Sequence, residues 1–300
     1  MPTSAENELV RKQWTDLVAA LAPPAGIPEY RAGFEQLCAT FPVPAGTRIE
    51  PVNAGGVPAL TITHPAVLAA ARTIMWTHSG GYVFGSAHGY RAFGASLSLA
   101  AGARVLMLDY RLAPEHRHPA ALEDATGAYR WLLAQGDRPE RIVIGGDSAG
   151  GGLALATLLA LKDAGDPLPA GGIAVSPLAD QTLSGESMDA RAQLDPIASR
   201  EMLAGLGQLY VGQADPAHPY LSPLFGDFTG LPPLLVLVGT DEVLYDDAAR
   251  VVERASAAGV EARLLVGPDQ THIWPLFASV LPEGQDAVTE IGRFAATVAP

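Results

Sequence analysis

The segment RIVIGGDSAGGGLALATLLAL, residues 141–161, most constrains how this chain can fold. An apolar strand ends in the run Gly146-Asp147-Ser148-Ala149-Gly150, and an apolar helix follows at once. So sharp a strand-to-helix turn holds its serine in strained backbone geometry, with the hydroxyl pointing out of the sheet. The glycines two residues before and after Ser148 remove side chains that would collide across the turn. This GxSxG pattern predicts that Ser148 is a nucleophile.

The rest of the chain alternates short β-rich runs with helical stretches, which predicts an α/β fold with helices on both faces of the sheet. The later strands are continuous apolar runs, as parallel strands buried on both faces require. The first two, joined through Gly55-Gly56, are expected to form an antiparallel hairpin at the edge. Strands are expected at 48–52, 59–63, 73–77, 104–109, 141–145, 172–176, 234–238 and 262–266, and helices at 92–101, 120–133, 149–163, 246–258 and 285–297.

Two segments stand outside this alternation. Residues 1–45 predict two helices, 6–21 and 28–39, separated by the Pro- and Gly-containing breaker 22–26. Residues 183–228 contain a polar start, a helix at 199–210 and a Pro-rich stretch. We therefore expect a mostly parallel eight-stranded core from residues 46–182 and 229–300, with residues 1–45 as an N-terminal helical cap segment and 183–228 as a cap insertion.

A serine nucleophile needs an oxyanion hole, an acid and a base. Glycines in the His78-Ser79-Gly80-Gly81 loop let the backbone approach a substrate oxygen, so the amides of Gly80 and Gly81 are expected to join that of Ala149. Asp241 and His272 each follow a later predicted strand, in the order serine, acid, histidine. Functional groups gather at the carboxyl ends of strands in such sheets. We therefore expect Asp241 as the acid and His272 as the base, with Glu242 and Asp246 as weaker candidates for the acid.

Composition excludes other functions. The net charge of −13 repels phosphate backbones and anionic membranes, so neither nucleic acid nor membrane is an expected partner. Neither lysine follows a glycine and no GxGxxG occurs, so phosphate-loop and dinucleotide sites are excluded. The single cysteine and the isolated His116-x-His118 pair predict no metal site, and no cofactor is expected. The polar N-terminus and the lack of a membrane-length apolar run favour a cytoplasmic protein.

The chain resembles the hormone-sensitive-lipase-like bacterial esterases of the α/β-hydrolase fold. The resemblance covers roughly residues 70–300 and rests on the HSGG loop, the GDSAGG turn and the stretch DYRLAPEHRHPAALEDA at 109–125. It implies a carboxylic-ester hydrolase with a helical cap, with Ser148, Asp241 and His272 in the catalytic roles. Three positions depart from the family pattern: Ser79 replaces the first glycine of HGGG, Asp-Glu-Val replaces Asp-Pro-Leu at 241–243, and Ile-Trp replaces Gly-Phe at 273–274.

The expected function is hydrolysis of short to medium acyl esters or lactones through an acyl-enzyme, with a small-molecule ester or lactone as the partner. The run GTDEVLYDD is similar to members that act on monoterpene lactones, so a lactone-specific hydrolase is one alternative. A non-catalytic binding relative is another, although it would not need His272. An epoxide hydrolase or dehalogenase would need an aspartate in place of Ser148.

The remaining expectations concern partners and supporting residues. A homodimer is a possible assembly, and an ion pair between Arg111 and Glu115 is expected to brace the active-site loops. Aromatic residues expected to line the substrate pocket are Tyr82, Tyr210 and Trp274, together with Trp14, Phe34 and Phe84.

Overall fold

In the computed structural model, which describes residues 4–20 and 26–300, eight strands form one sheet in the order β1-β2-β4-β3-β5-β6-β7-β8. β1 pairs antiparallel with β2, and β2 with β4, whereas the remaining neighbours are parallel. The expected edge hairpin and the mostly parallel sheet are confirmed. The strands are β1 (Arg48–Ala54), β2 (Val57–Thr63), β3 (Arg72–Thr77), β4 (Ala103–Leu108), β5 (Ile142–Asp147), β6 (Gly171–Val175), β7 (Leu234–Gly239) and β8 (Ala262–Gly267).

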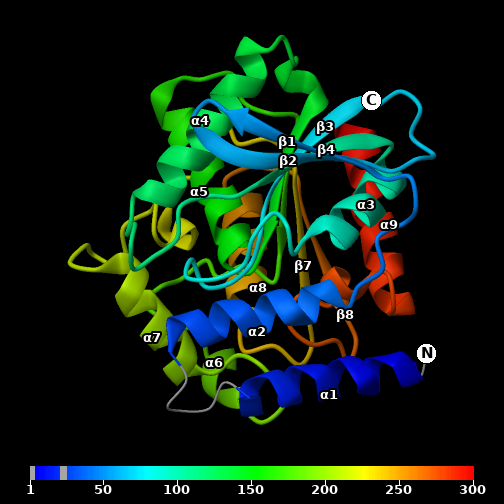
Figure 1. Cartoon of the computed structure of the whole chain (residues 1–300). Coiled ribbons are helices and arrows are strands. Elements are labelled where there is room, and N and C mark those ends of the chain that lie inside the picture. Colours follow the sequence, from blue (N-terminus) through cyan, green and yellow to red (C-terminus); the bar gives the residue numbers. More distant parts are fainter. Residues whose placement is uncertain (1–3, 21–25) are drawn as a thin grey trace.

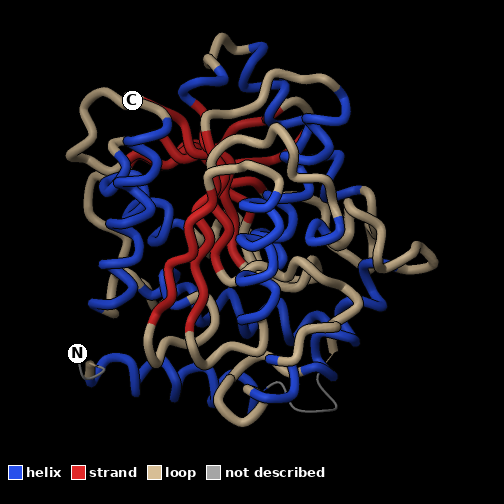
Figure 2. Tube along the Cα trace, turned by 180° about the vertical axis from the view of Figure 1, so that it is seen from behind, coloured by secondary structure: helices blue, strands red, loops and turns tan. Residues whose placement is uncertain are grey.

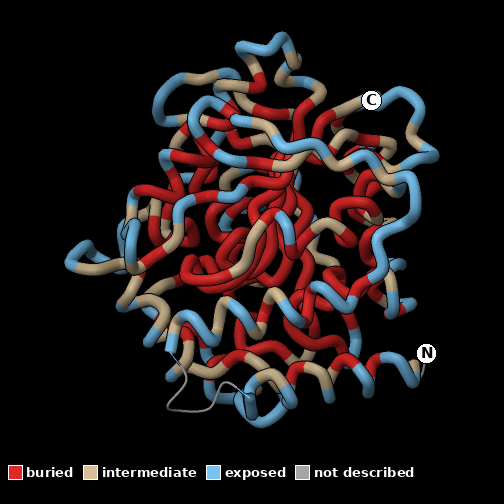
Figure 3. Tube along the Cα trace, viewed as in Figure 1, coloured by how far each residue is buried: buried red, intermediate tan, exposed pale blue. Residues whose placement is uncertain are grey.

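Helices cover both faces of the sheet (Figures 1 and 2). α3 (Arg91–Ala101) and α9 (Pro282–Val298) pack together on one face, and α4 (Ala120–Ala134), α5 (Ala149–Ala164) and α8 (Tyr245–Ala257) lie on the other. Every residue of β5, β6 and β7 is therefore buried, and Figure 3 shows this buried centre. None of the helices in the described part of the chain is long and apolar enough to cross a bilayer.

Four helices lie along the edge of the sheet where the parallel strands end (Figure 1). They are α1 (Ala5–Ala20), α2 (Ile27–Ala39), α6 (Ser187–Ala190) and α7 (Arg200–Val211). Apart from the short α6, these are the helices expected in segments 1–45 and 183–228. The last residue expected in the first helix, and most of the expected breaker, fall at 21–25, outside the described residues.

α1 is attached to the core by one buried aromatic side chain and by polar contacts at its start. Trp14 is only 1% exposed and packs edge-on against Phe277, with ring centroids 5.2 Å apart. Ser4 Oγ donates to Glu283 at 2.7 Å, and Asn7 Nδ2 donates to the carbonyl of Asp269 at 3.1 Å. These contacts hold α1 against the loops that follow the last strands.

α2 is attached through Arg31. Its guanidinium donates to the carbonyl of Val83 at 2.9 Å and forms an ion pair with Glu115 at 2.7 Å. The expected pairing of Arg111 with Glu115 is wrong, because Arg111 instead pairs with Asp124 at 2.8 Å. Glu115 therefore joins α2 to the core rather than bracing one core loop against another.

The burial of Trp14 predicts that this side chain stabilises the whole domain. Trp14→Ala should lower the free energy of unfolding by about 3 kcal/mol, since it removes a large buried ring and leaves a cavity. Leu9→Ala is the matched control on the same helix: Leu9 is 61% exposed, and its truncation should change stability by less than about 0.5 kcal/mol. Urea denaturation measures both. Equal losses would show that α1 does not pack as described.

Candidate active site

The turn between β5 and α5 holds Ser148 in a backbone conformation that side-chain-bearing residues rarely adopt, with φ 55° and ψ −121°. The amide of Ser148 donates to the carbonyl of Val175 at 2.8 Å, which fixes the turn to β6. A Cβ atom on Gly150 would lie 2.0 Å from the carbonyl oxygen of Thr77, so only glycine fits there. The helix start thus presses against the end of β3, and Ser148 stands at the carboxyl edge of the sheet.

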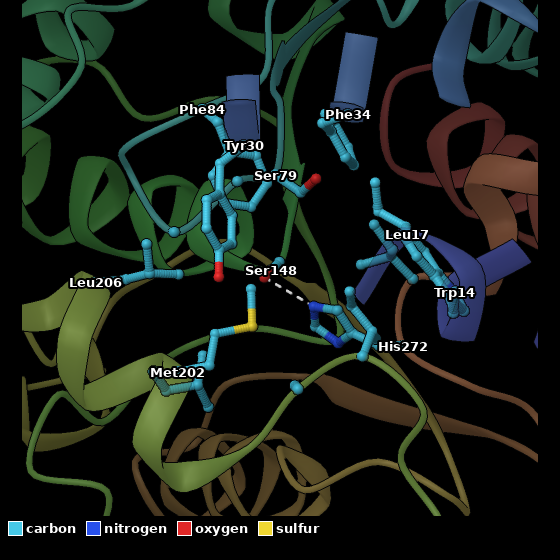
Figure 4. Close-up of a pocket in the computed structure, with 16 residues that line it drawn as sticks. Trp14, Leu17, Tyr30, Phe34, Ser79, Phe84, Ser148, Met202, Leu206 and His272 are labelled. Atoms are coloured by element: carbon cyan, nitrogen blue, oxygen red, sulfur yellow. Dashed lines mark hydrogen bonds between the residues drawn. The ribbon is translucent and has the colours of Figure 1, made fainter. Parts of the chain in front are cut away.

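Three side chains from three strand ends form one hydrogen-bonded row. His272 Nε2 lies 2.8 Å from Ser148 Oγ (Figure 4), and His272 Nδ1 lies 2.9 Å from Glu242 Oε2. Ser148 follows β5, Glu242 follows β7 and His272 follows β8, so the parallel sheet brings them together at one edge. The geometry is that of a serine, a base that can accept its proton, and a carboxylate that orients the base.

The expectation that Asp241 is the partner of His272 is wrong, because the neighbouring Glu242 occupies that position. The carboxylate of Asp241 instead forms an ion pair with Arg11 of α1 and accepts a hydrogen bond from Thr240 Oγ1 at 3.0 Å. Adjacent residues in the turn after β7 point to different sides. Asp241 therefore faces α1, and the longer Glu242 side chain reaches inward to the histidine.

Asp246, the other weaker candidate, accepts a hydrogen bond from the amide of Ser187 at 2.8 Å and serves the junction with α6. Glu242 is fixed through its second carboxylate oxygen. Ser176 Oγ donates to Glu242 Oε1 at 2.8 Å, and the amide of Gly239 donates to the same oxygen. Ser176 Oγ also accepts a hydrogen bond from the amide of Ile273, next to the histidine, at 3.1 Å. These contacts set the orientation of the acid relative to the base.

Burial and mutual attraction control the charges of this pair. Burial raises the pKa of Glu242, and the hydrogen bond and charge of His272 partly offset that rise. For His272, burial alone would lower the pKa, but the hydrogen bond and the charge of Glu242 outweigh it. The pKa of His272 is therefore raised above its ordinary value, with further contributions from the negative charges of Asp195 and Asp147. The imidazole is thus a stronger base than a free one.

Backbone amides beside Ser148 are suited to bind an oxyanion. Gly80 has a φ of 116°, and a Cβ there would lie 2.0 Å from the carbonyl oxygen of Phe84. Gly80 and Gly81 line the same cavity as Ser148. Within residues 4–20 and 26–300, no protein group accepts a hydrogen bond from the amides of Gly80, Gly81 or Ala149. The amides expected to form the oxyanion hole are therefore unoccupied by the protein itself.

The cavity that contains Ser148 and His272 is apolar, and together with its part open to solvent it encloses about 560 Å³. Its walls come from the helices at the carboxyl edge of the sheet and from the loops around Ser148 and His272. In Figure 4, Trp14 and Leu17 of α1 lie on the side of His272, and Met202 and Leu206 of α7 lie on the opposite side of Ser148. The other apolar lining side chains are Tyr30, Phe34, Phe84, Ile197, Ala198, Leu203 and Ile273.

Three of the aromatic residues expected in this pocket are not part of its wall. Tyr82 and Tyr210 stack on each other, with ring centroids 3.7 Å apart, and both are buried. Trp274 is buried and faces a separate hollow between β8 and α9. Trp14, Phe34 and Phe84 do line the cavity.

Sequence reasoning missed the wall formed by α7. Met202, Leu203 and Leu206 recur at the three- and four-residue spacing of one helix face, within a helix that was expected. That spacing was the available signal. It does not by itself say whether the apolar face packs on the core or lines a cavity.

His118, the second histidine of the His116-x-His118 pair, lies next to α7. His118 packs edge-on against Tyr210, with ring centroids 5.9 Å apart. Across the described ranges, no group of three or more histidine, cysteine, aspartate or glutamate side chains is placed to hold a metal ion.

Comparison with known proteins agrees with the fold. Residues 74–276 match a family of the α/β-hydrolase fold. An acetyl-hydrolase of Streptomyces hygroscopicus is 45% identical over 226 residues, covering 75% of this chain and 76% of the relative. An esterase of Acinetobacter venetianus is 36% identical over 269 residues, covering 89% and 88%. The crystal structure of an esterase from the bacterial hormone-sensitive lipase family is 42% identical and covers 100% of both chains, with a TM-score of 0.96.

The chain belongs to the α/β-hydrolase fold family, and within it to the hormone-sensitive-lipase-like branch. The resemblance drawn from HSGG and GDSAGG is therefore confirmed, even though the acid next to His272 is a glutamate one residue beyond the expected aspartate.

The assignment of the acid can be tested with two adjacent substitutions. Glu242→Gln should lower kcat for an ester substrate by on the order of 1,000- to 10,000-fold, because an amide neither holds the imidazole tautomer nor stabilises imidazolium. Asp241→Asn should lower kcat by less than about 5-fold, since it removes the charge paired with Arg11 and leaves the contact between His272 and Glu242 in place. Steady-state kinetics on both purified variants measures this. A large loss in Asp241→Asn with little change in Glu242→Gln would return the role to Asp241.

Proposed function

We propose that this chain hydrolyses carboxylic esters by a serine mechanism with an acyl-enzyme intermediate. Its family and its relatives named esterase and acetyl-hydrolase make it a hydrolase of ester bonds. The observation that carries the serine mechanism is the row of hydrogen bonds from Ser148 through His272 to Glu242, at the wall of an apolar cavity. This arrangement activates a hydroxyl that is otherwise a weak nucleophile.

In the first half-reaction, Ser148 Oγ bonds to the ester carbonyl carbon while His272 Nε2 takes the hydroxyl proton. The electron pair of the carbonyl moves to its oxygen, where the amides of Gly80, Gly81 and Ala149 bind the negative charge. Glu242 holds Nδ1–H of the imidazole and stabilises the imidazolium. When the oxyanion collapses, the bond to the alcohol oxygen breaks, and His272 gives its proton to the departing alcohol.

In the second half-reaction, water repeats the same steps on the acyl-enzyme. His272 takes a proton from the water, whose oxygen bonds to the acyl carbon, and the same amides bind the second oxyanion. Its collapse breaks the bond to Ser148, and His272 returns the proton to Oγ. The carboxylic acid leaves as the second product and Ser148 is regenerated. His272 carries every proton, so no further group is needed to balance the reaction.

The cavity favours esters with short to medium acyl chains. Its wall is almost entirely apolar, which suits alkyl substituents, and Met202 and Leu206 restrict its extent beside Ser148 (Figure 4). A lactone undergoes the same first half-reaction, except that its alcohol stays tethered to the acyl group. We propose linear esters as the main substrates and lactones as the alternative within the same chemistry.

The direct test is hydrolysis of p-nitrophenyl esters from acetyl to dodecanoyl, with a parallel set of lactones, by the wild type and by Ser148→Ala. The proposal expects turnover that is highest for short to medium chains and that disappears in Ser148→Ala. Unchanged turnover in Ser148→Ala would contradict the serine mechanism. Faster hydrolysis of the dodecanoyl than of the butanoyl ester would contradict the chain-length proposal. Turnover of lactones without turnover of linear esters would contradict the proposal that linear esters are the main substrates.

The pH dependence follows from the raised pKa of His272. The imidazole must be neutral to accept the proton, so kcat/KM should fall as the pH is lowered through a midpoint above 6.5, the ordinary value. Glu242→Gln removes the charge that raises this pKa and leaves at most a weaker, neutral hydrogen bond, so its residual activity should have a lower midpoint. The profile of kcat/KM from pH 4.5 to 9 measures both midpoints. A midpoint that stays in place in Glu242→Gln would contradict the pairing.

Met202→Ala tests the wall formed by α7. Shortening this side chain enlarges the cavity beside Ser148, so the best acyl chain should become longer by about two to four carbons. One additional methylene in an apolar pocket is typically worth a factor of about 10 or more in kcat/KM. Leu209→Ala is the matched control, since Leu209 lies on the same helix but does not line the cavity. An unchanged chain-length profile in Met202→Ala would show that this wall does not limit the substrate.

A further inference from the structure

Ser79 stands where the family pattern HGGG has its first glycine. The structure shows what the side chain at this position contacts. Tyr90, which immediately precedes α3, directs its hydroxyl oxygen at this residue: Tyr90 Oη lies 2.6 Å from Ser79 Oγ. The amide of Ser79 also donates to Tyr90 Oη, at 3.2 Å. Backbone and side chain of Ser79 are thus tied to one phenolic oxygen.

The same tyrosine reaches the nucleophile turn. Its hydroxyl contacts Asp147 Oδ2, and Trp76 Nε1 donates to Asp147 Oδ1 at 2.8 Å. Asp147 is the last residue of β5 and directly precedes Ser148. All four side chains are buried, with exposed fractions of at most 3%. A chain of hydrogen bonds therefore joins Ser79, in the loop just after β3, to Asp147, the last residue of β5.

The protonation states of Tyr90 and Asp147 decide which group donates each of these hydrogen bonds. Burial and the neighbouring charge of Asp147 raise the pKa of Tyr90 well above its usual value, so the phenol keeps its hydrogen. Burial also raises the pKa of Asp147, to about 6, although hydrogen bonds from Tyr90 and Trp76 oppose that rise. At neutral pH the carboxylate accepts the single hydrogen of Tyr90. The hydroxyl of Ser79 is then left to donate to Tyr90 Oη.

We infer that the Ser79–Tyr90–Asp147 hydrogen-bond chain positions the oxyanion hole of the proposed hydrolase. The hole has two halves on separate segments, since the amides of Gly80 and Gly81 follow Ser79 while the amide of Ala149 follows Ser148. The hydrogen bonds join Ser79, which directly precedes Gly80, to Asp147, which lies two residues before Ala149. They set the distance between the amides that must bind one oxygen together. Tyr90, Ser79 and Asp147 are positioning residues, because they act through these amides.

Such a role affects the transition state more than the bound substrate. Amides directed at the oxyanion stabilise charge that develops only during the reaction, so displacing them lowers kcat and leaves KM nearly unchanged. Loss of an entire oxyanion donor typically costs on the order of 100- to 1,000-fold in kcat. A displaced donor costs less than a missing one. The inference rests on the proposed serine mechanism and adds a requirement that the mechanism alone does not contain.

Tyr90→Phe tests the inference, since it removes the phenolic oxygen and all three of its contacts while keeping the ring. We expect kcat for p-nitrophenyl butanoate to fall about 10- to 100-fold with KM changed less than about 3-fold. Ser79→Ala removes only the hydroxyl contact and should lower kcat by a smaller factor, about 3- to 10-fold. It also serves as the second variant should Tyr90→Phe fold poorly. A trifluoromethyl ketone, which forms an oxyanion-bearing adduct with Ser148, should lose affinity by the same factor as kcat/KM falls in each variant.

Tyr129→Phe is the matched control. Tyr129 is fully buried, and its hydroxyl donates to the carbonyl of Pro167 at 2.8 Å, away from the cavity. This variant should lose stability without a change in kcat or in ketone affinity. Wild-type values of kcat and ketone affinity in a folded Tyr90→Phe, or in Ser79→Ala, would overturn the inference while leaving the serine mechanism intact. Failure of the mechanism itself has a different signature, which is ester turnover that persists in Ser148→Ala.

Discussion

The imidazole of His272 is the link on which the rest of the site depends, because it touches groups from two other strand ends at once. Its two nitrogens lie 2.8 Å from Ser148 Oγ and 2.9 Å from Glu242 Oε2. These distances hold only if β5, β7 and β8 keep their order and register, which the fully buried central strands ensure. The strained conformation of Ser148 is maintained by the same packing, since Gly150 presses against the end of β3. The sheet therefore supplies geometry, and the loops at its carboxyl edge supply chemistry.

Electrostatics and the helices at that edge complete the site. Burial would make both His272 and Glu242 poorly ionised if each stood alone, but the pair stabilises its own charged form. Ser176 and the amide of Gly239 bind Oε1 of Glu242, the carboxylate oxygen that does not contact His272. α1 adds a further constraint, because Arg11 contacts both Asp241 and the carbonyl of Asp269, in the two loops that carry the acid and the base. The first helix thus lines the cavity and also joins these loops.

Much of this structure could be predicted from the sequence. Apolar runs located the strands within one or two residues, and the GxSxG turn with its strand before and helix after located Ser148. The order of the partners located His272. The prediction of Asp241 as the acid was wrong. Asp241 and Glu242 are adjacent, and the choice between them depends on Arg11, which is distant in sequence and pairs with Asp241. Motif resemblance favoured the aspartate, and no local pattern carries such a long-range contact.

The pocket was harder to predict for a similar reason. An aromatic residue in a loop fits the core as well as a cavity, and Tyr82 with Tyr210 satisfied each other by stacking. The role of Ser79 could not be read from its loop alone, since its partners Tyr90 and Asp147 come from two other segments. Sequence thus indicated which strand ends hold the chemistry. Side-chain direction at those ends needed the three-dimensional contacts.

The central claim is that Ser148, activated by His272 and Glu242, is the group that bonds to the substrate's acyl carbon. The most direct measurement is reaction of the purified chain with a p-nitrophenyl alkylphosphonate, followed by tandem mass spectrometry of its peptides. The account predicts one equivalent of p-nitrophenol released and a single adduct on Ser148. It also predicts loss of ester turnover in proportion to labelling. An adduct on another residue, or full ester turnover by a chain completely labelled at Ser148, would contradict it.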